Sequence, residues 1–110
     1  MKHSLNEVEG IQLVELGEDI VTENVEEFDA IIRGIIENSK YKIILNLKNV
    51  NFMCSSGLGV IVAGFKSTRE NDGDIKITFM NDRIRRLFEI TRLNKVISEY
   101  DNNEQAIKSF

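Results

Sequence analysis

Two adjacent serines, Ser55 and Ser56, are the side chains of this sequence best placed to do chemistry. The β-branched and leucine-rich run 41–47 before them predicts a strand, and apolar residues spaced at i, i+3, i+4 and i+7 after them predict a helix from about Ser56. The first N–H groups of a helix lack intrahelical acceptors, and the helix dipole is positive at that end. A phosphoryl group on either hydroxyl would meet ready donors, so this corner is suited to accept phosphate.

The same serines have a simpler explanation, because a serine before an amphipathic helix most often acts only as an N-cap. The segment that follows, Gly57-Leu58-Gly59, could be a phosphate-cradling loop, but a single Gly-x-Gly is weak evidence. Glycine inside a helix costs about 1 kcal/mol relative to alanine. We therefore interpret these glycines as positions that a partner or a neighbouring strand approaches closely.

Cys54, directly before the serines, could act as a redox thiol, since a helix N-terminus favours the reactive thiolate. The only histidine, His3, belongs to the first predicted strand and has no evident reason to pair with this thiol. A small, partly buried side chain is the simpler interpretation. One cysteine and one histidine also argue against a disulfide and a zinc site. No Ser-His-Asp set, P-loop or dinucleotide fingerprint is visible.

The hydrophobic pattern predicts the elements that must hold this corner in place. Strands are expected over residues 5–8, 11–16, 41–47, 75–79 and 96–100, and helices over 24–38, from about Ser56, over 82–91 and at the C-terminus. Run 41–47 is apolar on both faces, as a central strand covered by helices requires. Strands that alternate with helices predict one α/β domain over residues 1–110, with a mixed four- to five-stranded sheet, a starting hairpin at Glu9-Gly10 and about four helices.

Side chains that could cap these helices precede three of them. Short polar residues at such positions accept hydrogen bonds from first-turn N–H groups. The expected N-caps are Asn24, with Glu27 completing a capping box, Asn81 or Asp82, and Asn102 or Asn103.

Charge and composition exclude several classes of protein. With 18 acidic against 14 basic residues, the net charge of −4 argues against binding nucleic acid. No apolar run approaches the roughly 18 residues of a membrane span, and no signal peptide is present, so we expect a cytoplasmic protein without membrane insertion. The densest basic patch is interpreted as a solvated helix face: Arg83, Arg85, Arg86 and Arg92.

Two segments of the chain resemble the STAS domain of bacterial anti-sigma-factor antagonists. Residues 50–60, Val-Asn-Phe-Met-Cys-Ser-Ser-Gly-Leu-Gly-Val, match the family's hydrophobic, polar, aromatic, Met, Asp, Ser, Ser or Ala, Gly, Leu, Gly pattern at all but one position. Residues 81–96 resemble its segment N-x-x-V-x-x-x-L-x-x-T-G-L-D-K-V. The resemblance covers nearly the whole length and implies the STAS fold.

The resemblance implies a regulator that works by binding rather than an enzyme, with no cofactor. In the family, the serine at the position of Ser55 is phosphorylated by the anti-sigma factor, a serine kinase, and a PP2C-type phosphatase removes the phosphate. The unphosphorylated form binds the anti-sigma factor and frees the sigma factor. Ser56 becomes the expected cap and second candidate acceptor, and weaker candidates for the docking face are Arg83, Arg86 and Leu93. The expected partner-binding residues are Asp19, Cys54, Ser55, Ser56, Gly57, Leu58 and Gly59.

Two departures from the family pattern leave alternatives open. Cys54 replaces the family's aspartate before the serine, and Asp19 stands one residue early for the acid of the turn after the second strand. Leu58 is either a core anchor or an exposed contact for the anti-sigma factor. One rival function is a STAS scaffold that is not phosphorylated, in a stressosome-like particle or a lipid-transport ATPase. The other is a redox protein that uses Cys54.

Overall fold

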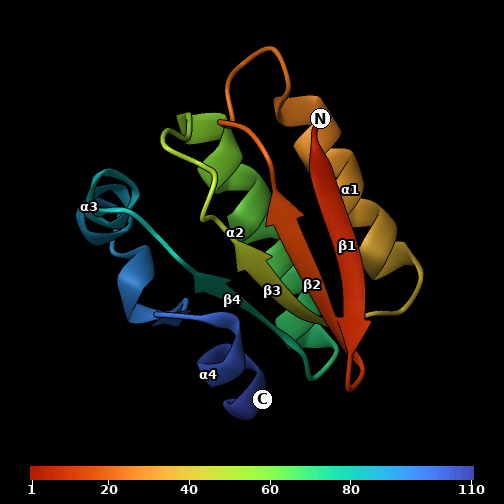
Figure 1. Ribbon diagram of the computed structural model, residues 1–110. Coiled ribbons are helices and arrows are strands. Elements are labelled where there is room, and N and C mark those ends of the chain that lie inside the picture. The colour runs from red at the N-terminus through yellow and green to blue at the C-terminus, as the bar shows by residue number, and fades with distance from the viewer.

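The computed structural model describes residues Met1–Phe110, and its centre is a five-stranded sheet in the order β1-β2-β3-β4-β5 (Figure 1). Only β1 and β2 are antiparallel, and every other neighbouring pair is parallel. The predicted α/β class, starting hairpin and central third strand are confirmed. The elements are β1 (His3–Val8), β2 (Ile11–Leu16), α1 (Val25–Glu37), β3 (Lys42–Asn46), α2 (Ser55–Glu70), β4 (Asp74–Thr78), α3 (Asp82–Ile90), a 3-10 turn (Leu93–Lys95), β5 (Glu99–Tyr100) and α4 (Asn103–Lys108).

Helices cover both faces of the sheet, as buried parallel strands require. The main core lies between the sheet and the helices α1 and α2, where Phe28, Ile61 and Ile77 are almost completely buried. The short helix α4 packs on the opposite face, over Ile11 and Ile44. In Figure 1, α2 begins at the end of the molecule where β3 ends, and α4 lies at the opposite end. None of the helices has the length and hydrophobicity needed to cross a bilayer.

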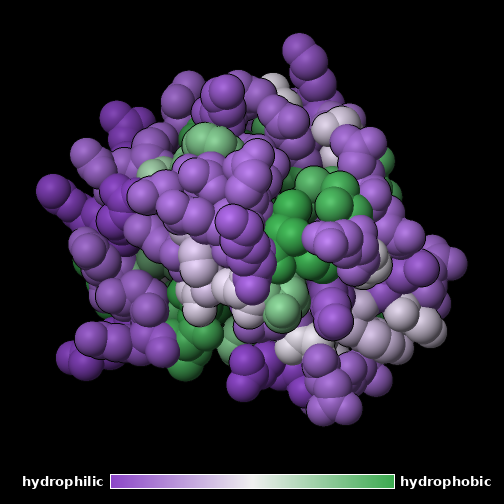
Figure 2. Space-filling model, turned by 60° about the horizontal axis from the view of Figure 1, so that its bottom comes forward, coloured by the Kyte–Doolittle hydropathy of each residue, from purple (hydrophilic) through white to green (hydrophobic).

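The polar side chains of β4 are buried beneath α4. Lys76 is only 6% exposed, and its Nζ donates to the carbonyl oxygen of Ser109 at 2.8 Å and to its hydroxyl at 2.7 Å. The ammonium also lies 4.3 Å from the ring centroid of Phe110. The strand ends at Thr78 rather than at residue 79, because Phe79 takes a left-handed φ of 57° and turns the chain. Seen from the α4 end, the surface is mainly hydrophilic with small, separate hydrophobic patches (Figure 2).

Two of the predicted side-chain caps are confirmed, whereas the capping box predicted for Asn24 and Glu27 does not form. Asn81 Oδ1 accepts from the Ile84 N–H at 2.8 Å, and Asn102 Oδ1 accepts from the Gln105 N–H at 2.9 Å. Asn24 occupies the N-cap position of α1 but makes no capping hydrogen bond with its side chain. Its amide is turned back toward the loop 17–24, where nearer polar groups bind it.

Candidate functional site

The corner between β3 and α2 presents both serines to solvent, yet neither of them is the N-cap. α2 begins at Ser55, so Cys54 is the N-cap, with the extended angles φ −74° and ψ 163°. No side chain caps this helix. The Gly57 N–H donates to the Cys54 carbonyl at 3.0 Å, whereas the N–H groups of Ser55 and Ser56 have no acceptor within the chain. Ser55 and Ser56 are both exposed. The prediction that Ser56 caps α2 is therefore wrong, because Ser56 is already the second helical residue.

A short backbone bridge determines where this helix starts. Ile20 and Met53 form an isolated parallel bridge. The Ile20 N–H donates to the Phe52 carbonyl at 3.1 Å, and the Cys54 N–H donates to the Ile20 carbonyl at 2.9 Å. Ile20 and Met53 are 0% and 1% exposed. The chain is thus held extended up to Cys54, and the helix begins one residue later.

Asp19 holds the same segment from the loop 17–24. Its Oδ1 accepts from the Asn51 N–H at 2.7 Å and from the Phe52 N–H at 3.2 Å. The structure thus brings Asp19 to the predicted corner, although the residue is distant from it in sequence. Its carboxylate orders the backbone that leads to Ser55.

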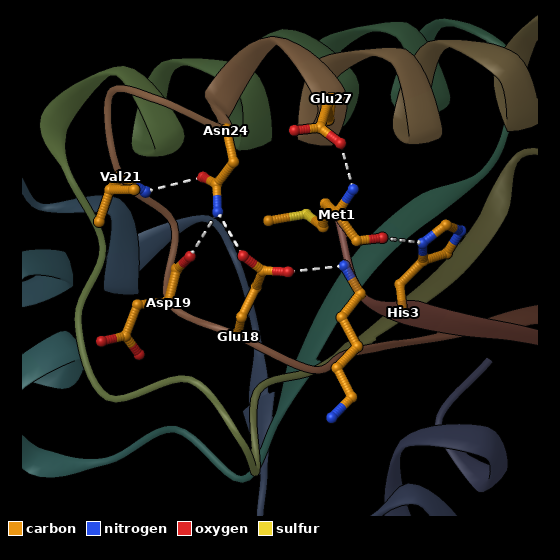
Figure 3. A network of polar contacts seen from close by, with 8 residues as sticks. Met1, His3, Glu18, Asp19, Val21, Asn24 and Glu27 are labelled. Carbon is orange, nitrogen blue, oxygen red and sulfur yellow. Dashed lines mark hydrogen bonds and ion pairs between the residues drawn. The ribbon is translucent and has the colours of Figure 1, made fainter.

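Asn24 in turn orders the loop that carries Asp19 (Figure 3). Its Nδ2 donates to Glu18 Oε1 at 3.0 Å and to the Asp19 carbonyl at 2.9 Å, while its Oδ1 accepts from the Val21 N–H at 2.9 Å. Glu18 Oε2 also accepts from the Lys2 N–H at 2.7 Å. The hydrogen bond from the Lys2 backbone, followed by that from the Asn24 amide, lowers the pKa of Glu18. Residue spacing held no signal for this network, because it depends on the path of the loop.

The glycines and the leucine after the serines have different surroundings. A Cβ on Gly57 would lie 2.9 Å from Ile20 Cγ2 and 2.9 Å from Met53 Cγ. The close neighbour at Gly57 is therefore this chain itself. Leu58 is only 6% exposed and belongs to the core, so of its two alternatives the core anchor is confirmed and the exposed contact is not. Gly57 is buried as well and offers no exposed surface to a partner. Gly59 is exposed, and a Cβ there would meet nothing within 4 Å.

A groove of about 430 Å³ opens between the segment before α2 and the helix α3. Its rim includes two exposed apolar side chains, Phe52 at 41% and Ile90 at 71% exposure. Arg83 and Arg86 reach it from α3, and neither forms an ion pair. The lining residues are Phe52, Met53, Cys54, Ser55, Arg83, Arg86, Leu87 and Ile90.

Arg85, on the same helix, points elsewhere and is fully engaged. It donates to Glu99 Oε1 at 2.8 Å, to Asp82 Oδ1 at 2.6 Å and to the Met80 carbonyl at 2.8 Å. The hydrogen bond with Glu99 is the main cause that raises the pKa of Arg85. The three arginines of α3 that were predicted to form a solvated face therefore differ in role. Arg85 is bound within the chain, whereas Arg83 and Arg86 line the groove.

Cys54 has no histidine beside it. Its thiol is free and half-buried, whereas His3 lies on β1 with its Nδ1 2.8 Å from the Met1 carbonyl. Leu93, also predicted near the docking face, packs against the core instead of lining the groove.

Comparison with known proteins identifies relatives over most of the chain. The model of the STAS domain matches residues 2–106. The anti-sigma-B factor antagonist of Staphylococcus aureus (strain NCTC 8325 / PS 47) is 33% identical over 91 residues, which cover 83% of this chain and 84% of the relative. The anti-sigma F factor antagonist of Paenibacillus polymyxa is 38% identical over 65 residues, which cover 59% of this chain and 56% of the relative.

Solved structures share the same fold. A Thermotoga maritima protein described as a candidate anti-sigma factor antagonist superposes with a TM-score of 0.93 at 23% identity, covering 97% of this chain and 92% of that protein. The Bacillus cell fate determinant SpoIIAA in its phosphorylated form gives a TM-score of 0.77 at 21% identity, covering 98% of both chains. At these identities the likeness establishes the arrangement of the helices and strands.

Proposed function

The chain belongs to the STAS domain family, and on this premise we propose that it is an anti-sigma-factor antagonist that binds its partner at the corner around Ser55. The observation that carries the proposal is the exposure of Ser55 on the first turn of α2, at an edge that Asp19 and Ile20 hold in place. The names of the Staphylococcus and Paenibacillus relatives support it. The chain acts by binding, in the cytoplasm, and carries out no reaction of its own.

Phosphorylation of Ser55 switches the interaction off. The partner is an anti-sigma factor with serine kinase activity, which transfers the γ-phosphoryl group of ATP to the Ser55 hydroxyl. The bond from Oγ to phosphorus forms as the bond from phosphorus to the ADP oxygen breaks, and the hydroxyl proton leaves to solvent. The product carries about −1.5 to −2 extra charges on a surface that the partner would have to desolvate. The complex dissociates for that reason.

A PP2C-type phosphatase reverses the modification by hydrolysing the phosphoserine. Water then supplies the oxygen of the inorganic phosphate that leaves, and the Ser55 hydroxyl is restored. The exposure of Ser55 supports access for both enzymes.

One observation favours a second candidate function, a STAS scaffold that is never phosphorylated. Cys54 stands where the family has an aspartate, and one oxygen of the remaining carboxylate, Asp19 Oδ1, is occupied by two backbone amides. Both features reduce the acidic groups free to orient a kinase-bound metal ion. Such a scaffold would assemble in a stressosome-like particle or with a lipid-transport ATPase.

Phosphorylation by a partner kinase tests the proposal directly. The chain is incubated with ATP and an anti-sigma-factor kinase of its own genome, and its intact mass is measured. We expect a gain of about 80 Da, one phosphoryl group. The gain should persist in the matched control Ser56→Ala and vanish in Ser55→Ala.

Binding of the same kinase, measured by calorimetry, supplies the second readout. The unmodified chain and Ser56→Ala should bind, and the phosphorylated chain should not. A chain that gains no mass but is isolated from its native cells within a large STAS assembly would favour the scaffold instead.

A further inference from the structure

Arg83 and Arg86 are cations without an assigned task. Both are exposed on α3, and both line the groove that also contains Ser55. The chain forms six ion pairs, and neither arginine takes part in any of them. Arg85 lies between them in sequence but faces the other way, and it is bound to the carboxylates of Glu99 and Asp82 and to the Met80 carbonyl.

We propose that Arg83 and Arg86 form an internal binding site for the phosphoryl group on Ser55. This inference rests on the proposed function only in that the phosphate must be present. A guanidinium group presents its N–H donors in a planar fork that matches the oxygens of a phosphate, and such charge-assisted pairs are among the strongest hydrogen bonds in proteins. Two of them on the far wall of the groove can close over a phosphate attached to the near wall.

The charges around the groove agree with this role. Arg83 and Arg86 are the only charged residues of its lining. Cys54, the position where the family carries an aspartate, contributes no carboxylate. Asp19 is the acid that contacts the segment before α2, and its Oδ1 is bound to the Asn51 and Phe52 amides. A phosphate dianion at Ser55 therefore meets two cations in the groove and no neighbouring carboxylate in its lining.

The site also changes how the switch operates. In the unmodified chain the two guanidinium groups stand free beside the exposed Phe52 and Ile90, as part of the face open to a partner. After phosphorylation the same groups fold onto the phosphate. The modification thus removes two cations from the docking face as well as adding a dianion to it.

The experiment uses the full chain with phosphoserine incorporated at position 55 during translation, so that no kinase is needed. Phosphorus NMR follows the second pKa of the phosphate, which is near 6 in an unperturbed phosphoserine. Two cations in contact should lower that pKa by about one unit or more. The double variant Arg83→Gln/Arg86→Gln should lose most of this shift. The matched control Arg92→Gln/Lys95→Gln removes two exposed cations outside the groove and should keep it.

The proposal would be overturned if the phosphate pKa in Arg83→Gln/Arg86→Gln equalled that of the phosphorylated parent chain. The lowering of the pKa would then come from the first turn of α2 alone. Equal loss in both double variants would also overturn it, since only the net charge would matter. Thermal unfolding of each variant verifies that it is folded. A Ser55 that no kinase modifies would contradict the proposed function but leave this test intact, which keeps the two failures apart.

Discussion

The segment 50–54 before α2 has two contrasting sides. On the side of the loop 17–24, polar groups are engaged: Asp19 binds two amides, and the Asn24 amide forms three hydrogen bonds. On the side of α3, the serine and two arginines line an open groove and have no ion pair. On the first side the polar groups are bound within the chain, as in a protein interior. On the second side they are open to solvent.

The difference shows how a small domain can hold one hydroxyl ready for a partner. Unpaired polar groups at a surface cost little, because water binds them, whereas buried ones must find partners within the chain. The loop 17–24 therefore supports the structure of the corner, whereas the groove contains the residues of the proposed site. Substitutions on the two sides should separate these properties, with a loss of stability that is largest at the buried contacts and smallest in the groove.

Gly57→Ala should have the largest effect. The new methyl group would lie within 3 Å of the Ile20 and Met53 side chains, both buried. Such overpacking typically costs about 1–3 kcal/mol. Chemical denaturation measures the free energy of unfolding. Gly59→Ala is the matched control, and it should stabilise α2 by about 0.5–1 kcal/mol, because its Cβ has open space. Equal effects of the two substitutions would contradict the close packing of Ile20 and Met53 against Gly57.

Asn24→Ala should lower stability by about 1–2 kcal/mol, since the Val21 N–H loses its acceptor and a buried amide is removed. Amide hydrogen exchange of Asn51 and Phe52 should also accelerate, because the loop that positions Asp19 loosens. Asn38→Ala at the other end of α1 removes one exposed hydrogen bond and serves as the control. A faster exchange in both variants would argue against a specific coupling.

Glu18→Gln should reveal a pH-dependent part of this support. The hydrogen bonds from Lys2 and Asn24 lower the pKa of Glu18 below its ordinary value of 4.5. The ionised group therefore contributes stability that is present above about pH 4.5 and is lost as the pH falls through the folded-state pKa. The melting temperature of the variant should be lower than that of the parent at pH 7, and the difference should shrink as the pH falls below 4.5 and through the lowered pKa of Glu18. Glu70→Gln, outside this network, is the control, and a gap independent of pH would refute the assignment.

Ser55→Ala and Arg83→Gln/Arg86→Gln should change the free energy of unfolding least, by about 0.5 kcal/mol or less, as for surface positions generally. None of these side chains forms an ion pair within the chain. Chemical denaturation of both variants checks this expectation. A large loss of stability in either variant would contradict the view that the groove residues contribute little to the stability of the fold.

Much of the fold was predictable because the periodic burial of side chains in helices and strands produces a hydrophobic pattern in the local sequence. Hydrophobic spacing predicted the order of strands and helices, and short polar residues predicted the caps at Asn81 and Asn102. The same local logic was wrong at Asn24, which forms its hydrogen bonds within the loop before the helix. It also misplaced the cap of α2, because the bridge between Ile20 and Met53 lets that helix begin at Ser55, one residue before the predicted start.

Residue types at short spacings were enough to predict the class of fold, the family resemblance and the serine at the corner. Tertiary packing decided which neighbours of that serine are buried and support the corner, and which are exposed at the surface. Leu58 and Gly57 face the interior, and Asp19 reaches the corner across about thirty residues of chain. Arg83 and Arg86 share a groove with Ser55, while Arg85 does not. These facts depend on how separate elements pack against one another, and no local pattern encodes them.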